Sequence, residues 1–196
     1  MARIGIFGGT FDPIHFGHLA AAVNARHAAG LDRILLVVAN VPWQKEGTRE
    51  LTPAQTRFEL VRQAVEGIDG LEASDVEIKR GGLSYTIDTV SELRRVFPLD
   101  RFFLVVGADA AAGIEEWERT EELPALAELV VVNRPGHPRP ENLGGWERAI
   151  MAEIPSLDIS STDLRQRARD DRPLEFLMPR GAIEYIRENQ LYLDEP

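Results

Sequence analysis

The sequence predicts an α/β protein, a single Rossmann-like domain over residues 1–196 with a mostly parallel sheet flanked by helices. Short apolar runs alternate with helix-like segments along the chain. The runs are continuous rather than alternating in polarity, which is typical of strands covered on both faces, and such strands joined by helices form parallel sheets. No internal repeat or convincing domain boundary interrupts this pattern, and the length is sufficient to bury a core.

Five apolar runs, rich in Val, Ile and Leu, are the expected strands. They are residues 4–7, 34–39, 76–78, 102–106 and 129–132. Because each is short and bounded by polar or turn-forming residues, we interpret them as strands rather than as buried helices.

Helices are expected between and after these strands. Thr52 is interpreted as an N-cap, because Pro53 behind it suits the first position of a helix. The expected helices are residues 54–65, 84–97 (ended by Pro98), 109–116, 161–168 and 180–189. The last two form a C-terminal helical part, about residues 160–196, that is expected to pack against the edge of the sheet. The Pro- and Gly-rich stretch 134–145 is expected to be a surface loop.

The composition narrows the classes of partner. The chain has 32 acidic and 22 basic residues and a net charge of −10, which argues against a nucleic-acid or anionic-membrane surface. Cysteine is absent, which suits the cytosol, and no apolar run has the length of a membrane span or of a secretion leader. We expect a cytoplasmic protein without membrane or nucleic-acid partners, and the sequence makes no prediction of the oligomeric state.

The stretch from Gly8 to His18 joins the first strand to a helix-favouring segment and is the first candidate site. Gly8 and Gly9 let the backbone approach a ligand closely, and free N–H groups at a helix start favour an anion. His15 and His18 are three residues apart, so both rings face one point if Gly17 opens the helix. Because imidazole titrates near neutrality, the pair can also carry positive charge.

Two other interpretations of this stretch are open. One is a tight strand-to-helix turn with surface or capping histidines, and the other is a zinc site. Zinc needs a third and usually a fourth ligand, whereas the chain offers no cysteine and no third histidine at a ligand-like spacing. Phosphate binding is therefore favoured over metal binding.

A second candidate phosphate site lies at residues 160–165. Ser160, Ser161 and Thr162 precede a helix-like run, so hydroxyls and unpaired N–H groups converge there. Arg165, one turn further on, has a guanidinium group that binds phosphate oxygens in two places. The alternative is ordinary helix capping beside a solvated arginine.

Two further candidates follow the strand at residues 102–106. Gly107 and Asp109 stand at its carboxyl end, where open α/β sheets bind ligands, although Asp109 also suits a helix cap. Trp117 lies in a charged segment and either packs into the core or lines a ligand pocket.

Two motifs carry a resemblance to a known family. Residues 9–19, Gly-Thr-Phe-Asp-Pro-Ile-His-Phe-Gly-His-Leu, resemble the T/H-x-G-H signature of the nucleotidylyltransferase superfamily, and residues 159–165, Ile-Ser-Ser-Thr-Asp-Leu-Arg, resemble its I-S-S-T-x-x-R motif. Together with their spacing, they make essentially the whole chain similar to the bacterial nicotinate mononucleotide adenylyltransferase family. The resemblance implies transfer of AMP from ATP, accompanied by Mg²⁺, to nicotinate mononucleotide, which yields deamido-NAD and pyrophosphate.

The resemblance also implies roles for individual residues. His18 is expected at the α-phosphate, His15 at a neighbouring phosphate, and Asp109 at a ribose hydroxyl. Ser161, Thr162 and Arg165 are expected at the β- and γ-phosphates. The implied ATP site comprises Gly8, Gly9, Thr10, Phe11, His15, His18, Gly107, Asp109, Ser160, Ser161, Thr162 and Arg165, and the implied catalytic residues are His15, His18, Lys45 and Arg165.

For the acceptor, the resemblance implies that Trp117 stacks on the pyridine ring, with Thr86 beside it and Arg134 near the nucleotide. Lys45 is expected to offer charge to a phosphate. The chain departs from the family here, because Trp43-Gln44-Lys45 stands where Pro-His-Lys is common, and Gln44 cannot titrate as histidine does.

The implied reaction needs neither a general base nor a covalent intermediate, because a phosphate nucleophile is already ionised at neutral pH. Catalysis then depends on aligning two anions and on stabilising the charge that develops on the α-phosphate and the leaving pyrophosphate. The alternatives are nicotinamide mononucleotide or phosphopantetheine as the acceptor, a non-catalytic adenine-nucleotide sensor, and a fragment of a tRNA-charging enzyme. The acidic balance argues against the last of these.

Overall fold

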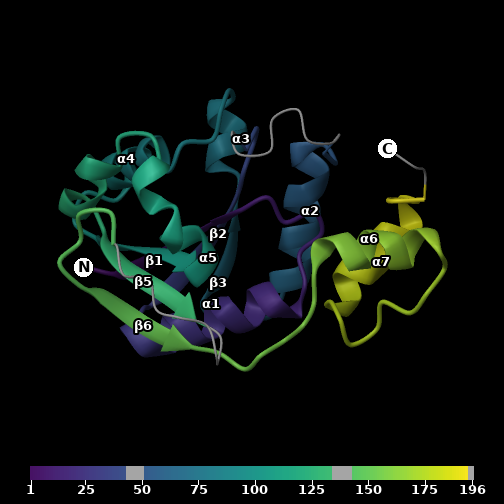
Figure 1. Cartoon of the computed structure of the whole chain (residues 1–196). Coiled ribbons are helices and arrows are strands. Elements are labelled where there is room, and N and C mark those ends of the chain that lie inside the picture. Colours follow the sequence, from purple (N-terminus) through teal and green to yellow (C-terminus); the bar gives the residue numbers. More distant parts are fainter. Residues whose placement is uncertain (43–50, 134–142, 194–196) are drawn as a thin grey trace.

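A computed structural model describes residues 1–42, 51–133 and 143–193. Its strands are β1 (Arg3–Gly9), β2 (Arg33–Val38), β3 (Leu71–Ser74), β4 (Arg101–Gly107), β5 (Glu128–Asn133) and β6 (Ala149–Glu153). They form one six-stranded sheet in the order β3-β2-β1-β4-β5-β6, and every neighbouring pair is parallel (Figure 1). The prediction of an α/β Rossmann-like fold is confirmed.

Helices cover both faces of this sheet (Figure 1). The α-helices are α1 (Phe16–Ala29), α2 (Ala54–Val65), α3 (Val76–Arg80), α4 (Thr86–Val96), α5 (Ala108–Ala112), α6 (Ser161–Arg169) and α7 (Arg180–Glu188), and the 3₁₀ helices are η2 (Ile114–Glu116) and η3 (Thr120–Ala125). Buried side chains of α1, α2, α6 and α7 pack in one hydrophobic cluster, and those of α4, α5, η2 and η3 in another.

Successive side chains along a strand point to opposite faces of the sheet, so a central strand contributes to both clusters. On β2, Ile34 and Leu36 belong to the cluster with α1 and α2, whereas Leu35 and Val37 belong to the cluster with α4. All four side chains are at most 6% exposed. The strand is therefore buried on both faces, which explains its continuous apolar run.

The two edge strands of the sheet were not predicted from the sequence. Residues 76–78, expected to be a strand, lie in α3, and the strand of that region is β3, where only Leu71 is buried. The opposite edge strand, β6, was not expected, and of its residues only Ala152 is buried. Edge strands are covered less completely than central ones, and β3, with the sequence Leu-Glu-Ala-Ser, has no continuous apolar run. The apolar run of β6, residues 149–152, was not interpreted as a strand.

The expected helices are present with some changes. Residues 54–65 are helical as predicted, but Pro53 rather than Thr52 occupies the N-cap position. The helix expected at 109–116 is two pieces, α5 and η2, separated at Gly113. The prediction that the C-terminal helices lie on the edge of the sheet is wrong, because α7 packs against α2.

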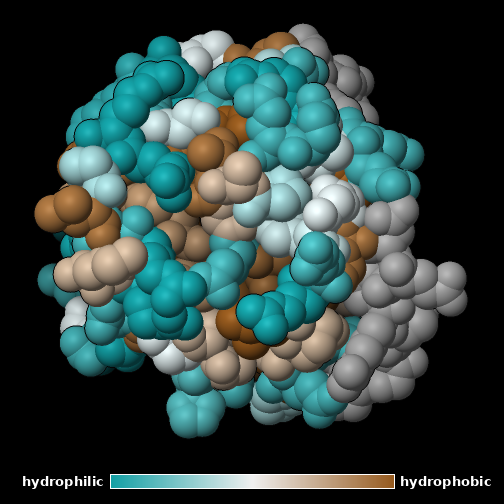
Figure 2. Space-filling view, turned by 90° about the vertical axis from the view of Figure 1, so that its left-hand side faces the viewer, coloured by the Kyte–Doolittle hydropathy of each residue, from teal (hydrophilic) through white to brown (hydrophobic). Residues whose placement is uncertain are grey.

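On the face of the molecule drawn in Figure 2, hydrophilic side chains predominate and hydrophobic ones form small, separate areas. In the described part of the chain, no helix combines the length and the apolar composition that crossing a membrane requires.

The packing of α2 provides a test of this core. Leu60 on α2 is fully buried in the cluster shared with α7, so Leu60→Ala is expected to lower the free energy of unfolding by about 2–5 kcal/mol. The control is Arg62→Ala on the exposed side of α2, whose ion pair with Glu59 lies at the surface and is expected to contribute little to stability. Urea denaturation measures both, and equal losses in the two variants would contradict the assigned packing.

Candidate active site

The loop that follows β1 is built around the ring of Phe11. A Cβ on Gly9 would lie 2.6–2.9 Å from this ring, so the glycine is required by close packing. The backbone of Phe11 has a φ of 48°, a left-handed conformation that is costly for a bulky residue. Edge-to-face contacts with Phe7 and His18 hold the ring in place. The loop is thus fixed by aromatic packing next to the start of α1.

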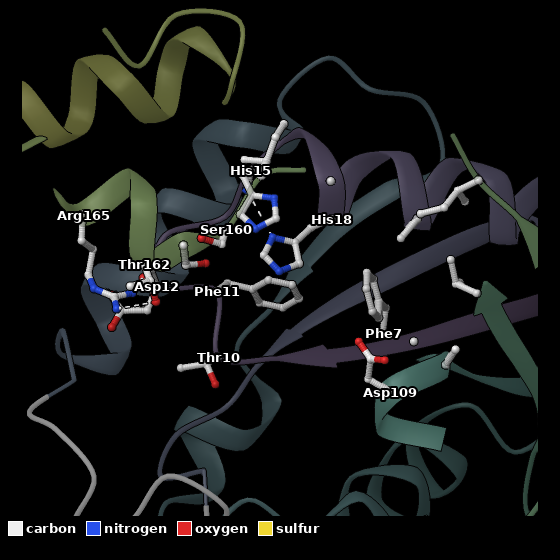
Figure 3. A pocket seen from close by; sticks show the side chains of 18 residues that line it. Phe7, Thr10, Phe11, Asp12, His15, His18, Asp109, Ser160, Thr162 and Arg165 are labelled. Carbon is white, nitrogen blue, oxygen red and sulfur yellow. Dashed lines mark hydrogen bonds between the residues drawn. The ribbon is translucent and has the colours of Figure 1, made fainter. Parts of the chain in front are cut away.

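The two histidines at the start of α1 lie together, as expected. Their rings stack with centroids 3.8 Å apart, and both line the same cavity (Figure 3). His15 is the N-cap of α1, which begins at Phe16 rather than at Gly17. A Cβ on Gly17 would lie 2.9 Å from Nδ1 of His15, so this glycine leaves room for the ring.

One hydrogen bond sets the proton position on His18. The backbone N–H of His15 donates to Nδ1 of His18 at 3.2 Å. With Nδ1 an acceptor, His18 is in the neutral form that carries its proton on Nε2. His18 can therefore donate a hydrogen bond to an anion from Nε2.

The segment at residues 160–165 caps α6 and also joins the loop after β1. Ser160 is the N-cap, and its Oγ accepts from the backbone N–H of Asp163 at 3.1 Å, which is the ordinary capping role. Ser161 Oγ donates to the carbonyl of Pro13 at 2.8 Å. This bond brings the beginning of α6 to the beginning of α1.

Arg165 strengthens the same connection. Its Nη1 donates to the carbonyl oxygen of Asp12 at 2.6 Å, and its Nη2 donates to Thr162 Oγ1 at 3.1 Å. Figure 3 shows the side chains of Arg165, Thr162 and Asp12 on one side of the cavity and the two histidines above it. The guanidinium is therefore held in place at the cavity by protein groups.

The cavity between these segments has a volume of about 740 Å³. It contains ten of the twelve residues expected to bind ATP: Thr10, Phe11, His15, His18, Gly107, Asp109, Ser160, Ser161, Thr162 and Arg165. The N-termini of α1 and α6 both lie at this cavity, and helix N-termini favour anions. Its lining therefore suits a polyanion.

A second cavity of about 290 Å³ adjoins the first. The residues lining both are Phe7, Thr10, Phe11, His18 and Gly107. Gly8 and Gly9 line the second cavity rather than the first, together with Thr86 and Trp117, which were expected at the acceptor. Two ligands that occupied the two cavities would thus meet beside His18.

The sequence left two interpretations each for Asp109, a helix cap or a ligand contact, and for Trp117, a core residue or a pocket residue. Asp109 is exposed in the first turn of α5, whose N-cap is Gly107, so it does not take the capping position; Figure 3 shows it at the cavity. Trp117 both packs against the core cluster of α4 and lines the second cavity.

Lys45, Arg134 and Gln44 lie outside the described residues. Within the described ranges, no three His, Cys, Asp or Glu side chains are grouped to bind a metal ion.

A buried carboxylate on one side of the first cavity was not predicted from the sequence. Asp12 is 2% exposed, and its Oδ1 accepts from the hydroxyl of Tyr192 at 2.9 Å. Burial and the nearby Asp12 raise the pKa of Tyr192. The two residues are 180 positions apart, so no local pattern indicates the contact.

The polar wall of the second cavity was also missed. It consists of Glu77, Ser84 and Thr89. The signal for it was a carboxylate inside the apolar run 76–78, which had been interpreted as a strand.

Comparison with known proteins gives a consistent result over nearly the whole chain. The cytidylyltransferase-like family model matches residues 6–167. A probable nicotinate-nucleotide adenylyltransferase of Corynebacterium kroppenstedtii is 42% identical over 97% of this chain and 91% of its own length. One of the same name from Thermus thermophilus is 42% identical over 97% of this chain and 99% of its own.

The fold is also similar to solved structures. The nicotinic acid mononucleotide adenylyltransferase of Plasmodium falciparum, complexed with NaAD, superposes with a TM-score of 0.78 and 20% sequence identity and covers 98% of both chains. A second structure of that protein, complexed with APC, gives a TM-score of 0.76. At this identity the likeness concerns the fold.

Tyr192→Phe tests the buried contact with Asp12. Loss of a hydrogen bond to a charged group is expected to lower the free energy of unfolding by about 1.5–3 kcal/mol. The pKa of Tyr192 is raised, so this contribution is fully present below pH 10, the ordinary value, and is lost as the pH rises further. The stability difference from the wild type is therefore expected to be constant from pH 7 to 9 and to shrink above pH 10.

The matched control is Tyr185→Phe. Within the described part of the chain, the Tyr185 hydroxyl has no hydrogen-bond partner. Denaturation of both variants across pH is the measurement. A Tyr192 variant as stable as the Tyr185 variant would show that the buried contact contributes nothing.

Proposed function

Because the chain belongs to the cytidylyltransferase-like family and, within it, to the nicotinate-nucleotide adenylyltransferases, we infer that it transfers AMP from ATP to nicotinate mononucleotide. The products are deamido-NAD and pyrophosphate, and the reaction belongs to NAD biosynthesis. The single observation that carries the proposal is the meeting of two cavities at His18, one lined for a polyanion and one with an aromatic wall.

The division of the cavities supports an assignment of substrates. The larger cavity, with two helix N-termini, two histidines and Arg165, suits the triphosphate of ATP. The smaller one contains Trp117 and Thr86, which suits a flat pyridine ring beside a hydroxyl. With this arrangement, the acceptor phosphate and the α-phosphate of ATP meet at the shared wall, beside His18.

We propose a mechanism of alignment and charge stabilisation. The acceptor phosphate attacks the α-phosphorus, and pyrophosphate leaves. His18 donates from Nε2 to the α-phosphate oxygen on which charge develops, and His15 serves a neighbouring phosphate. Ser161, Thr162 and Arg165 hold the β- and γ-phosphates, and Asp109 accepts from a ribose hydroxyl.

Further parts of the proposal concern groups outside these contacts. Lys45 and Arg134 add positive charge at the acceptor phosphate. ATP brings Mg²⁺, an ion that is usually held by substrate phosphates and several waters, and the ion neutralises phosphate charge when bound. We further propose that residues 1–196 act as one domain and that the protein works in the cytoplasm on small-molecule nucleotides.

The acceptor is tested by pyrophosphate release with ATP and Mg²⁺. Nicotinate mononucleotide, nicotinamide mononucleotide and phosphopantetheine are compared in parallel. The nicotinate form is expected to have a kcat/KM at least about tenfold above the others, about 1.4 kcal/mol of differential transition-state binding. A higher kcat/KM with another acceptor would identify that acceptor as the substrate. If none of the three supports pyrophosphate release, the chain is a nucleotide sensor rather than an enzyme.

The role of His18 is tested by His18→Ala. Loss of a donor to developing charge is expected to lower kcat by about a hundredfold or more without loss of the fold. His27→Ala is the control, because His27 is exposed late in α1 and lines neither cavity. Near-wild-type turnover of the His18 variant would remove this residue from the mechanism.

A further inference from the structure

Two charged side chains are buried outside the phosphate site. Arg57 on α2 is 1% exposed and Glu77 on α3 is 7% exposed. Arg57 acts electrostatically on Glu77, but burial is the larger effect and raises the pKa of the carboxyl group. Buried charges are costly unless they are paired and hydrogen-bonded, and apolar replacements are often equally stable. Their burial is therefore weak evidence for a purely stabilising role.

Glu77 is connected to two hydroxyl groups at the second cavity. The Thr89 hydroxyl donates to Oε1 of Glu77 at 2.6 Å, and the Ser84 hydroxyl favours the ionised form of the same carboxyl group and so acts to lower its pKa. Arg80 donates to Thr89 Oγ1 at 3.0 Å, and the carbonyl of Tyr85 is a second, longer acceptor for the Thr89 hydroxyl at 3.3 Å. The carboxylate thus holds the Thr89 hydroxyl and interacts with Ser84.

Ser84 carries this arrangement to the exit of β2. Its Oγ accepts from the backbone N–H of Asn40 at 2.8 Å, and its own N–H donates to the carbonyl of Val41 at 2.9 Å. The Asn40 side chain donates to the carbonyl of Gly82 at 2.9 Å. Residues 82–84 are consequently attached to residues 40–41.

Arg57 also binds the backbone of Asn40. Its Nη2 donates to the carbonyl of Asn40 at 3.1 Å and its Nη1 to the carbonyl of Thr10 at 2.8 Å. The backbone of Asn40 is thus held between the Glu77–Ser84 pair and Arg57. Because Thr10 belongs to the loop after β1, the exits of β1 and β2 are fixed relative to each other.

This clamp, formed by Glu77, Ser84, Asn40 and Arg57, borders the cavity that contains Trp117. Glu77, Ser84 and Thr89 line it, as does Ala39 next to Asn40. The position of the Ser84 wall determines the space left for a planar ring in about 290 Å³. None of Glu77, Ser84 and Arg57 lines the larger cavity.

We propose that Glu77 is a positioning residue for the acceptor nucleotide, and that it acts through Ser84 and Asn40 to set the width of the acceptor cavity. The proposal rests on the proposed function, because it takes the second cavity as the acceptor site. The proposal predicts a different effect on the two substrates. A change at Glu77 or Ser84 moves the wall of the smaller cavity, whereas Arg57 still holds Thr10, which lines both cavities.

The test compares Glu77→Gln, Ser84→Ala and the double variant. Gln keeps the size of Glu77, but its NH₂ group cannot accept the second hydroxyl proton. Each single variant is expected to raise KM for nicotinate mononucleotide about tenfold and to leave KM for ATP within about twofold. Because both are proposed to act on the same wall of the cavity, the KM of the double variant is expected to be about equal to that of the more strongly affected single variant. Glu72→Gln, an exposed carboxylate on β3, is the matched control.

Equal increases in both KM values, multiplication of the two single effects in the double variant, or unchanged KM values would overturn the proposal. Denaturation of each variant separates loss of fold from loss of positioning, since a purely structural role lowers stability without the selective rise in KM. If the wild type releases no pyrophosphate with any acceptor, the proposed function fails. Calorimetric titration of nicotinate mononucleotide then tests the role of Glu77 without turnover. The proposal predicts that the mononucleotide binds Glu77→Gln about tenfold more weakly than the wild type, and equal binding would contradict it.

Discussion

The hydrogen bonds from α6 to the loop after β1 are the interaction on which the candidate site depends. Ser161 and Arg165 bind the carbonyl groups of Pro13 and Asp12, residues about 150 positions earlier in the chain. These bonds place two helix N-termini at one cavity in a protein with a net charge of −10. Under the proposed function, the local concentration of N–H groups, imidazoles and one guanidinium is expected to overcome the unfavourable overall charge, because short-range hydrogen bonds to an anion outweigh screened distant charges.

The parallel sheet supplies the second constraint. The strands β1, β2 and β4 end at the same edge, so the segments that follow them surround one region. Gly107 at the end of β4 and Thr10 after β1 line both cavities, and Asn40 after β2 is held by Arg57 and Ser84. The fold thus provides two adjacent compartments, and buried polar contacts between the loops set their shape.

How far the sequence predicts this structure depends on the range of the interactions involved. The central strands and the His15–His18 pair follow from local patterns, because burial on both faces and spacing on a helix are properties of short segments. The edge strand β3 does not, since partial burial leaves no apolar run, and the run of β6 contains two alanines, which do not favour strands. The contacts of Tyr192 with Asp12 and of Arg57 with Thr10 join distant positions, so only the folded chain reveals them.

Under the proposed function, the two cavities hold the two halves of one dinucleotide product. Equilibrium displacement measures this, with deamido-NAD titrated against bound nicotinate mononucleotide and, separately, against a bound non-hydrolysable ATP analogue. One product molecule per chain is expected to displace both ligands, because the product spans the wall shared at His18. Displacement of only one of the two ligands, or binding of the product together with either, would contradict it.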